Sequence, residues 1–167
     1  ALRGAGRIIA VGSRPKTLEL AERFGASNLV DYKKGDVLAQ VMELTGGEPV
    51  DGVLIASGGA PDRIFTTAMR AVKFGGNVAC VSLFFDEESV TLPLDVWMQG
   101  GMEKRLTGVL CNDGRDFFER LLALIRFKRL DPAPLATHVL HGWQRLEDGL
   151  RLMASRDPSV LKAVVVP

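Results

Sequence analysis

The sequence predicts an α/β fold in which helices cross between the strands of a mostly parallel sheet. Short apolar runs alternate with amphipathic stretches of about ten residues along most of the 167-residue chain. Glycine accounts for 18 of the 167 residues, about 11% against an average of about 7%, and it is concentrated where a strand would meet a helix. Strands that alternate with helices in this way form right-handed βαβ units. Ligands of such sheets bind beyond the carboxyl ends of the strands, so those ends are the candidate sites.

The first unit begins with an apolar strand at residues 7–12. Ser13 is placed to cap the following helix, and Pro15 suits its first turn. Gly25 marks the end of this helix, since glycine is typical of helix C-termini. The apolar face of the helix consists of Leu18, Ala21 and Phe24. A second strand is predicted at 28–32.

The next unit repeats this plan. Asp36 caps a helix that ends at Gly46, and an apolar strand follows at 50–56. A third helix shows the most regular apolar period in the chain, formed by Ile64, Phe65, Ala68, Met69 and Val72. A glycine pair then leads into a strand at 77–83.

The remaining elements are less regular. They are an extended run at 90–92, a short helix at 94–98, a strand at 104–111, a helix at 117–125, an extended run at 137–140, a helix at 143–153 and a strand at 161–166. No stretch repeats at a fixed period. The length is typical of one domain, which we expect to span residues 1–167.

The charge composition argues against a nucleic-acid partner. The chain has 21 Lys and Arg against 20 Asp and Glu, whereas proteins that bind the phosphate backbone are strongly basic. Cys80 and Cys111 are far apart and form no C-x-x-C pair, so neither a disulfide framework nor a zinc knuckle is indicated. No run approaches the roughly 18 apolar residues of a membrane span, and the first residues resemble no signal peptide. We therefore expect a soluble cytoplasmic protein without a membrane partner.

The corner after the first strand carries the strongest chemical signal. In a dinucleotide-binding fold, the corresponding position usually holds an Asp or Glu that binds the ribose hydroxyls and repels the 2′-phosphate of NADP. Here the corner offers Ser13 and Arg14 instead. A guanidinium can pair with a phosphate through two parallel hydrogen bonds, and the helix that follows adds free N–H groups. The alternative is an ordinary helix cap followed by a surface arginine.

Other strand ends give weaker signals. Ala56 and Ser57 precede a glycine pair that would let a backbone approach a ligand closely, although such pairs are also ordinary turns. Tyr32 ends a strand and could contact an adenine or a phosphate, or simply pack at an edge. Gly4 and Gly6 do not form the dinucleotide fingerprint, because they precede a strand instead of opening a helix.

No residues form a convincing catalytic set. His138 and His141 lie in a stretch that reads as extended, and no carboxylate or cysteine is spaced to complete a metal site with them. The G-x-S-x-G motif of serine hydrolases is absent from the sequence. We therefore expect no catalytic and no metal-ligating residues in this chain.

The sequence resembles the NADP-dependent secondary alcohol dehydrogenases, which are zinc enzymes of the medium-chain dehydrogenase/reductase superfamily. The resemblance begins in the stretch 3–15, where Gly12, Ser13 and Arg14 follow the first strand, and reaches the last strand at 161–166. The intervening matches are Val30-Asp31-Tyr32-Lys33, Gly108-Val109-Leu110-Cys111 and Thr137-His138-Val139 with Gly142. It therefore covers essentially the whole chain.

The resemblance implies a set of cofactor-binding residues from several places in the chain: Gly12, Ser13, Arg14, Tyr32, Ala56, Ser57, Val81, Ser82, Leu83 and Arg156. The first four match the site of the 2′-phosphate, and the next two lie on the adenosine side. The segment 81–83 matches the nicotinamide end, where Ser82 and Leu83 depart from the family pattern of Val-Asn-Tyr. Arg156 matches a lysine of the family and keeps its charge.

By resemblance, the chain is the NADP(H)-binding portion of an enzyme that transfers hydride between secondary alcohols and NADP to give ketones. The zinc, its ligands and most of the pocket for the small alcohol or ketone belong to the other half, so we expect the chain alone to be inactive. The resemblance also implies a homo-oligomer, either a dimer or a tetramer. Two alternatives are a non-catalytic Rossmann-like module for binding or oligomerisation, and a related medium-chain reductase of the quinone or threonine dehydrogenase type.

The implied fold is a Rossmann-like, doubly wound, mostly parallel sheet that lacks its first strand and glycine-rich turn. In the usual strand order 3-2-1-4-5-6, strand 1 is central. Without it, the strands at 7–12 and 50–56 would both be unpaired apolar edges, which favour association with other strands. We therefore expect the chain to close that gap, to pair with another chain, or to be marginally stable.

Overall fold

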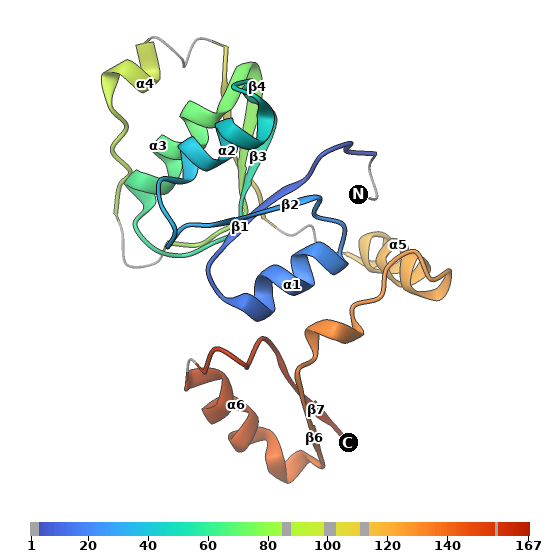
Figure 1. The fold of residues 1–167 in the computed structure, drawn as a ribbon. Coiled ribbons are helices and arrows are strands. Elements are labelled where there is room, and N and C mark those ends of the chain that lie inside the picture. The colour runs from blue at the N-terminus through green and yellow to red at the C-terminus, as the bar shows by residue number, and fades with distance from the viewer. Residues whose placement is uncertain (1–3, 85–87, 99–102, 111–113, 156) are drawn as a thin grey trace. The chain divides into compact units, whose positions relative to one another are not determined.

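The computed structural model describes residues 4–84, 88–98, 103–110, 114–155 and 157–167. These residues form parallel strands connected mostly by helices (Figure 1). The chain divides into two compact units, one made of Ala1–Lys33 with Asp113–Pro167 and the other of Lys34–Asn112. Each unit is described by itself below.

The first unit starts with a small βαβ arrangement of β1 (Ile9–Gly12), α1 (Pro15–Arg23) and β2 (Asn28–Asp31). The two strands are parallel, and each residue from Ile9 to Gly12 pairs with the one 19 positions later. Leu20 of α1 and Val30 of β2 are buried between these elements. The predicted strand, helix and strand are therefore all present here, each within a few residues of the expected bounds.

The start of α1 differs from the expectation in one respect. The residue at the N-cap is Arg14 and not Ser13, and no side chain caps the helix. The reason is Pro15 at the first helical position: its ring excludes the helical conformation from the residue before it. Arg14 is accordingly extended, with φ −87° and ψ 121°.

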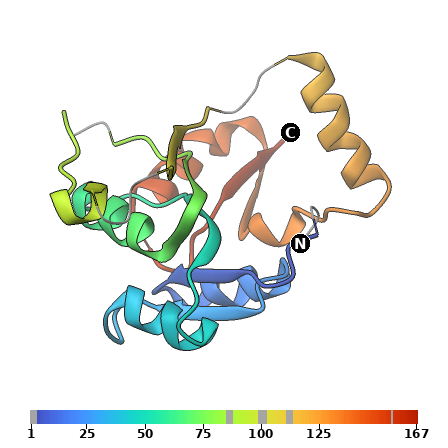
Figure 2. The same cartoon turned by 90° about the horizontal axis from the view of Figure 1, so that it is seen from above.

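The rest of the first unit contains α5 (Arg115–Arg126), a short 3₁₀ turn (Ala133–Leu135), β6 (His138–His141), a second 3₁₀ turn (Trp143–Arg145), α6 (Leu146–Ala154) and β7 (Ala163–Val166). β6 and β7 are parallel. The Cα of Gly149 lies so close to the sheet that an added Cβ would be 3.3 Å from Val165 and 3.4 Å from Leu140. In both views α5 lies away from β6, β7 and α6 (Figures 1 and 2).

The second unit contains α2 (Val37–Thr45), β3 (Val50–Ile55), α3 (Pro61–Ala71), β4 (Val72–Cys80), α4 (Leu94–Met98) and β5 (Arg105–Gly108). The predicted cap of α2 is confirmed, because the Asp36 carboxylate accepts a hydrogen bond from the N–H of Ala39 at 2.8 Å. Gly46 ends the helix in the left-handed conformation, as expected. The strands form a parallel sheet in the order β3-β4-β5.

β4 begins five residues earlier than predicted, directly after α3. Val72 pairs with Val50, but the next pair is Asn77 with Gly52, so residues 73–76 bulge out opposite one residue of β3. Gly76 is required at this bulge, since a Cβ there would lie 2.9 Å from the carbonyl oxygens of Asp51 and Lys73.

β5 is shorter than predicted. Its four residues end at Gly108, and the next two described residues lie outside the strand. Cys111, which the prediction included, lies outside the described residues.

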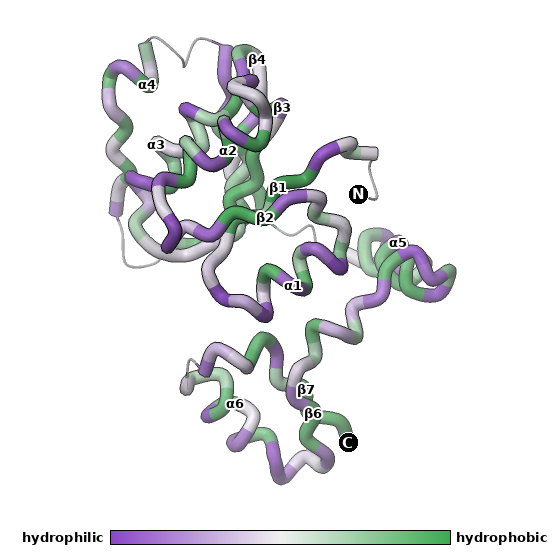
Figure 3. Tube along the Cα trace, in the orientation of Figure 1, coloured by the Kyte–Doolittle hydropathy of each residue, from purple (hydrophilic) through white to green (hydrophobic). Residues whose placement is uncertain are grey.

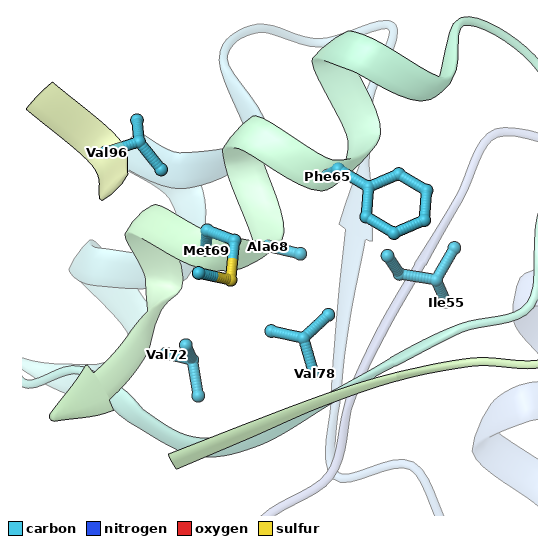
Figure 4. Packing of buried hydrophobic residues seen from close by; sticks show 7 residues of the cluster. All are labelled: Ile55, Phe65, Ala68, Met69, Val72, Val78 and Val96. Carbon is cyan, nitrogen blue, oxygen red and sulfur yellow. The ribbon is translucent and has the colours of Figure 1, made fainter. Parts of the chain in front are cut away.

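The core of the second unit lies between α3 and the inner face of the sheet, with α4 closing one side (Figure 4). It consists of Ile55, Phe65, Ala68, Met69, Val72, Val78 and Val96. All three α3 residues in this core, Phe65, Ala68 and Met69, belong to the apolar period noted in the sequence. The Lys104 ammonium donates a hydrogen bond to the carbonyl oxygen of Met69 at 2.7 Å, and burial lowers the pKa of this lysine.

The strands do not form one continuous sheet. The described residues form three separate parallel sheets, with strand orders β1-β2, β3-β4-β5 and β6-β7. β1 pairs only with β2 and β3 pairs only with β4, so each has one edge without a partner among the described strands.

Candidate functional site

The first candidate site is the corner between β1 and α1. β1 ends at Gly12, and Ser13 and Arg14 connect it to the helix. An added Cβ on Gly12 would lie 3.1 Å from the Leu18 side chain, so this position favours glycine for packing reasons alone. The Arg14 carbonyl oxygen accepts hydrogen bonds from the N–H groups of Thr17 and Leu18, at 3.0 and 3.1 Å. These contacts fix the backbone of the corner.

The start of α1 carries positive charge that would attract an anion. Arg14 is exposed, and none of the residues that the structure describes pairs with its guanidinium. α1 has neither a side-chain cap nor an acidic residue in its first turn. The positive end of the helix dipole therefore adds to the charge of the arginine.

Tyr32 lies beside this corner because β2 runs parallel to β1. The N–H of Tyr32 donates a hydrogen bond to the carbonyl oxygen of Gly12 at 3.1 Å. Its side chain is 47% exposed. The structure therefore brings Gly12, Ser13, Arg14 and Tyr32 together at the carboxyl ends of two adjacent strands.

A second candidate site lies at the carboxyl ends of β3 and β4, in the other unit. The N–H of Val81 and the hydroxyl of Ser82 both donate to the carbonyl oxygen of Ile55, at 3.0 and 3.4 Å. Ala56 and Ser57, which follow Ile55, are exposed, and so are Val81 and Leu83. Another set of the predicted residues is thus adjacent: Ala56, Ser57, Val81, Ser82 and Leu83. The last predicted residue, Arg156, lies outside the described residues.

Sequence reasoning missed one interaction at the first corner. Asp31, the last residue of β2, accepts a hydrogen bond from the N–H of Lys33 at 2.9 Å. Aspartate side chains in turns often accept a hydrogen bond from the backbone N–H two residues later. The position of Asp31 before Lys33 is therefore a signal that is visible in the sequence.

The two histidines lie at opposite ends of one strand. His138 and His141 are the first and last residues of β6, so their side chains are on opposite faces of the strand. The ring of His138 lies 3.1 Å from the Thr137 hydroxyl. Within the described ranges no group of three His, Cys, Asp or Glu side chains could hold a metal ion. Within those same ranges, no helix is both long and apolar enough to cross a membrane.

The chain is similar to known dehydrogenases. The family whose model matches is described as zinc-binding dehydrogenase, and the match covers residues 1–126. The NADP-dependent isopropanol dehydrogenase of Thermoanaerobacter brockii is 43% identical over 99% of this chain, and that of Clostridium beijerinckii is 39% identical over the same share. The L-threonine 3-dehydrogenase of Bacillus licheniformis is 29% identical.

Solved structures show the same fold. An alcohol dehydrogenase from Thermus sp. ATN1 matches with a TM-score of 0.80 at 27% identity, over 98% of this chain and 44% of that one. The chain also covers only 46% of each isopropanol dehydrogenase named above. It therefore spans about half the length of the curated relatives it matches.

Proposed function

We propose, because this chain belongs to the zinc-binding dehydrogenase family, that it is the NADP(H)-binding part of an alcohol dehydrogenase. The whole enzyme would transfer hydride between a secondary alcohol and NADP, giving a ketone. The observation that carries this proposal is the Arg14 guanidinium, which has no partner among the described residues and lies next to an uncapped helix end and to Tyr32.

The corner fits a 2′-phosphate on chemical grounds. A guanidinium binds phosphate through charge-assisted hydrogen bonds and keeps its charge at all relevant pH values. Ser13 provides a hydroxyl, and Tyr32 provides a second one from the adjacent strand. When bound, NADP would accept the hydride of the alcohol, while these residues of the chain bind and orient its adenosine end.

The remaining cofactor contacts are proposed from the resemblance together with the second corner. Ala56 and Ser57 would contact the adenosine side, and the segment 81–83 would lie near the nicotinamide, with Arg156 contributing a charge. The Ser82 hydroxyl is engaged with the carbonyl oxygen of Ile55. The segment 81–83 would therefore contact the cofactor through its backbone. The described residues offer no set of zinc ligands, so we assign no step of the reaction to a metal here.

Titration of the 167-residue chain with NADPH and NADH tests the proposal. We expect NADPH to bind more tightly, and Arg14→Ala to weaken NADPH binding by about 10- to 100-fold, since a charge-assisted contact contributes about 1.5–3 kcal/mol. NADH binding should change little. Arg14→Lys should recover part of the loss, because it restores the charge without the planar fork.

Arg23→Ala is the matched control. Arg23 lies at the opposite end of α1, where its partner, Asp131, is 4.0 Å away and also exposed. This variant should bind NADPH like the wild type. Equal affinity of the wild type for NADPH and NADH, together with no effect of Arg14→Ala, would contradict the proposal.

The chain by itself is expected to show no turnover of 2-propanol with NADP, because the zinc and its ligands are proposed to belong to the other half of the enzyme. A spectrophotometric assay at 340 nm with and without added zinc measures this. Zinc-dependent NADPH formation by the purified chain would contradict the division of roles.

A second candidate function is assembly. The open edges of β1 and β3 could pair with other strands, which supports a homo-oligomer, either a dimer or a tetramer. Analytical ultracentrifugation with and without NADPH separates the two functions: stable oligomers that bind no NADPH would favour assembly alone. A cytoplasmic location is also proposed, and fractionation of cells would test it.

A further inference from the structure

The chain leaves β2 through a turn that is closed by a side chain. Asp31 is the last residue of β2 and pairs with Gly12 in the parallel register. Its carboxylate accepts a hydrogen bond from the N–H of Lys33 at 2.9 Å. A contact of this kind, from an Asp to the backbone two residues later, replaces the hydrogen bond of an ordinary turn. The direction of the chain after β2 is therefore set by Asp31.

Tyr32 lies inside this turn and is held on both sides. Its own N–H is bound to the carbonyl oxygen of Gly12 at 3.1 Å, and the residue after it is bound to Asp31. Among the described residues, none forms a hydrogen bond with the Tyr32 hydroxyl, and the side chain is 47% exposed. The backbone of the turn is thus what directs this side chain.

Asp31 also brings a negative charge to the corner. Adjacent strands lie about 4.8 Å apart, so the carboxylate belongs to the strand next to Gly12 and the phosphate corner. A 2′-phosphate bound by Ser13 and Arg14 would add a further negative charge near this strand end, and like charges repel. The hydrogen bond of Asp31 and its charge should therefore act in opposite directions on binding.

We infer that Asp31 is the positioning residue of this corner. Its carboxylate fixes the turn that places Tyr32 beside Gly12, Ser13 and Arg14, and its charge weakens the binding that the turn supports. The inference rests on the proposed function, in which this corner binds the 2′-phosphate of NADP(H).

Two substitutions separate the hydrogen bond from the charge. Asp31→Asn keeps an acceptor oxygen for the N–H of Lys33 and removes the charge, whereas Asp31→Ala removes both. The measurement is the Kd of the full 167-residue chain for NADPH and NADH, followed by nicotinamide fluorescence. We expect Asp31→Asn to bind NADPH about two- to fivefold more tightly than the wild type, as removal of one nearby like charge allows.

The two variants should differ from each other. Asp31→Ala should bind NADPH about fivefold more weakly than Asp31→Asn, which corresponds to about 1 kcal/mol for one hydrogen bond. NADH, which lacks the 2′-phosphate, should bind both variants with affinities within about twofold of the wild type. Both changes remove the same charge, so tighter NADPH binding by Asp31→Asn than by Asp31→Ala would show that the hydrogen bond positions the turn.

Asp36→Asn is the matched control. Asp36 also accepts a backbone N–H through its carboxylate, but it caps α2 in the other unit. Asn caps helices as well as Asp does, so this variant should leave the ratio of the two affinities unchanged. Unfolding midpoints of all variants show whether a loss of binding is a loss of folding. If Asp31→Ala does not fold, Asp31→Val, which also lacks an acceptor and suits the end of a strand, takes its place.

Equal affinity of the Asn and Ala variants for NADPH would overturn the inference alone. Failure of the proposed function has a different signature, in which the wild type does not prefer NADPH and Arg14→Ala has no effect. That result would overturn both.

Discussion

The unit Lys34–Asn112 and the C-terminal segment 114–167 use similar helices with different results. α3 in the former and α5 in the latter are strongly amphipathic. α3 buries its apolar face against a three-stranded sheet, whereas α5 has no buried residue. α6 and the 3₁₀ turn before it likewise leave a stripe of apolar side chains exposed, consisting of Trp143, Leu146, Leu150 and Met153. Figure 3 shows this mixture of hydrophobic and hydrophilic residues along both helices.

The difference shows that an amphipathic period becomes a core only where a partner surface exists. In the C-terminal segment, α6 packs on β6 and β7 through Gly149, which is not part of its apolar stripe. A two-stranded sheet is too narrow to cover more of the helix, and such sheets are marginally stable in isolation. Among the described residues of the segment, only Gly149 and Val160 are buried.

The largest expected effect comes from emptying the core of the second unit. Met69 is 1% exposed, and Met69→Ala should lower the free energy of unfolding by about 3 kcal/mol, through lost burial and the cavity left behind. Leu150 is 66% exposed, and Leu150→Ala should change it by less than about 0.5 kcal/mol. Urea unfolding followed by circular dichroism measures both. Equal losses would contradict this difference between the two regions and show that the stripe on α6 is covered in solution, as in an oligomer.

A smaller effect is expected at the bulge of β4. Gly76→Ala should cost about 2 kcal/mol, because its Cβ would meet the backbone of Asp51 and Lys73 as well as the Val72 side chain. Gly58→Ala is the control, since no atom lies within 4 Å of its Cβ position. Thermal unfolding of the two variants tests this. A bulge that tolerates alanine as well as Gly58 does would mean that the sheet of this unit is less tightly defined than its core.

The smallest expected effect is on the pH dependence of stability. The hydrogen bond and charge of Lys73 lower the pKa of Asp51 below its ordinary value of 3.8. In the C-terminal segment, hydrogen bonds from Ser159 and the charge of His138 lower that of Asp157. Because the folded state holds these carboxyls ionised, their contribution is complete above about pH 3.8 and is lost as the pH falls through the lowered pKa. Both groups are exposed, so the loss should be slight.

Acid titrations of Asp51→Asn and Asp157→Asn, followed at probes in each region, test whether each carboxyl contributes to the stability of its own region. Asp51→Asn should flatten the pH dependence of the second unit, and Asp157→Asn that of the C-terminal segment. An unchanged acid limb in both variants would show that neither carboxyl is linked to folding.

Local signals predicted most of the elements and the candidate site. The Asp36 cap, the Gly46 stop and the apolar period of α3 depend on residues within one or two helical turns, so they are visible in the sequence. The corner with Ser13 and Arg14 could be found for a related reason: alternating strands and helices imply parallel strands, whose carboxyl ends share an edge. The expected cap at Ser13 is wrong because Pro15 keeps Arg14 out of the helical conformation, so that Arg14 becomes the N-cap.

The sequence by itself thus determined the alternation of elements, the parallel pairing and the residues at the strand ends. Tertiary structure decided which apolar faces are buried, where β4 bulges, and that strand pairing stops between β1 and β3. It also decided that Asp31 closes the turn beside Gly12. The physical reason is range: caps and helical periods depend on neighbouring residues, whereas burial and strand pairing depend on surfaces from distant parts of the chain.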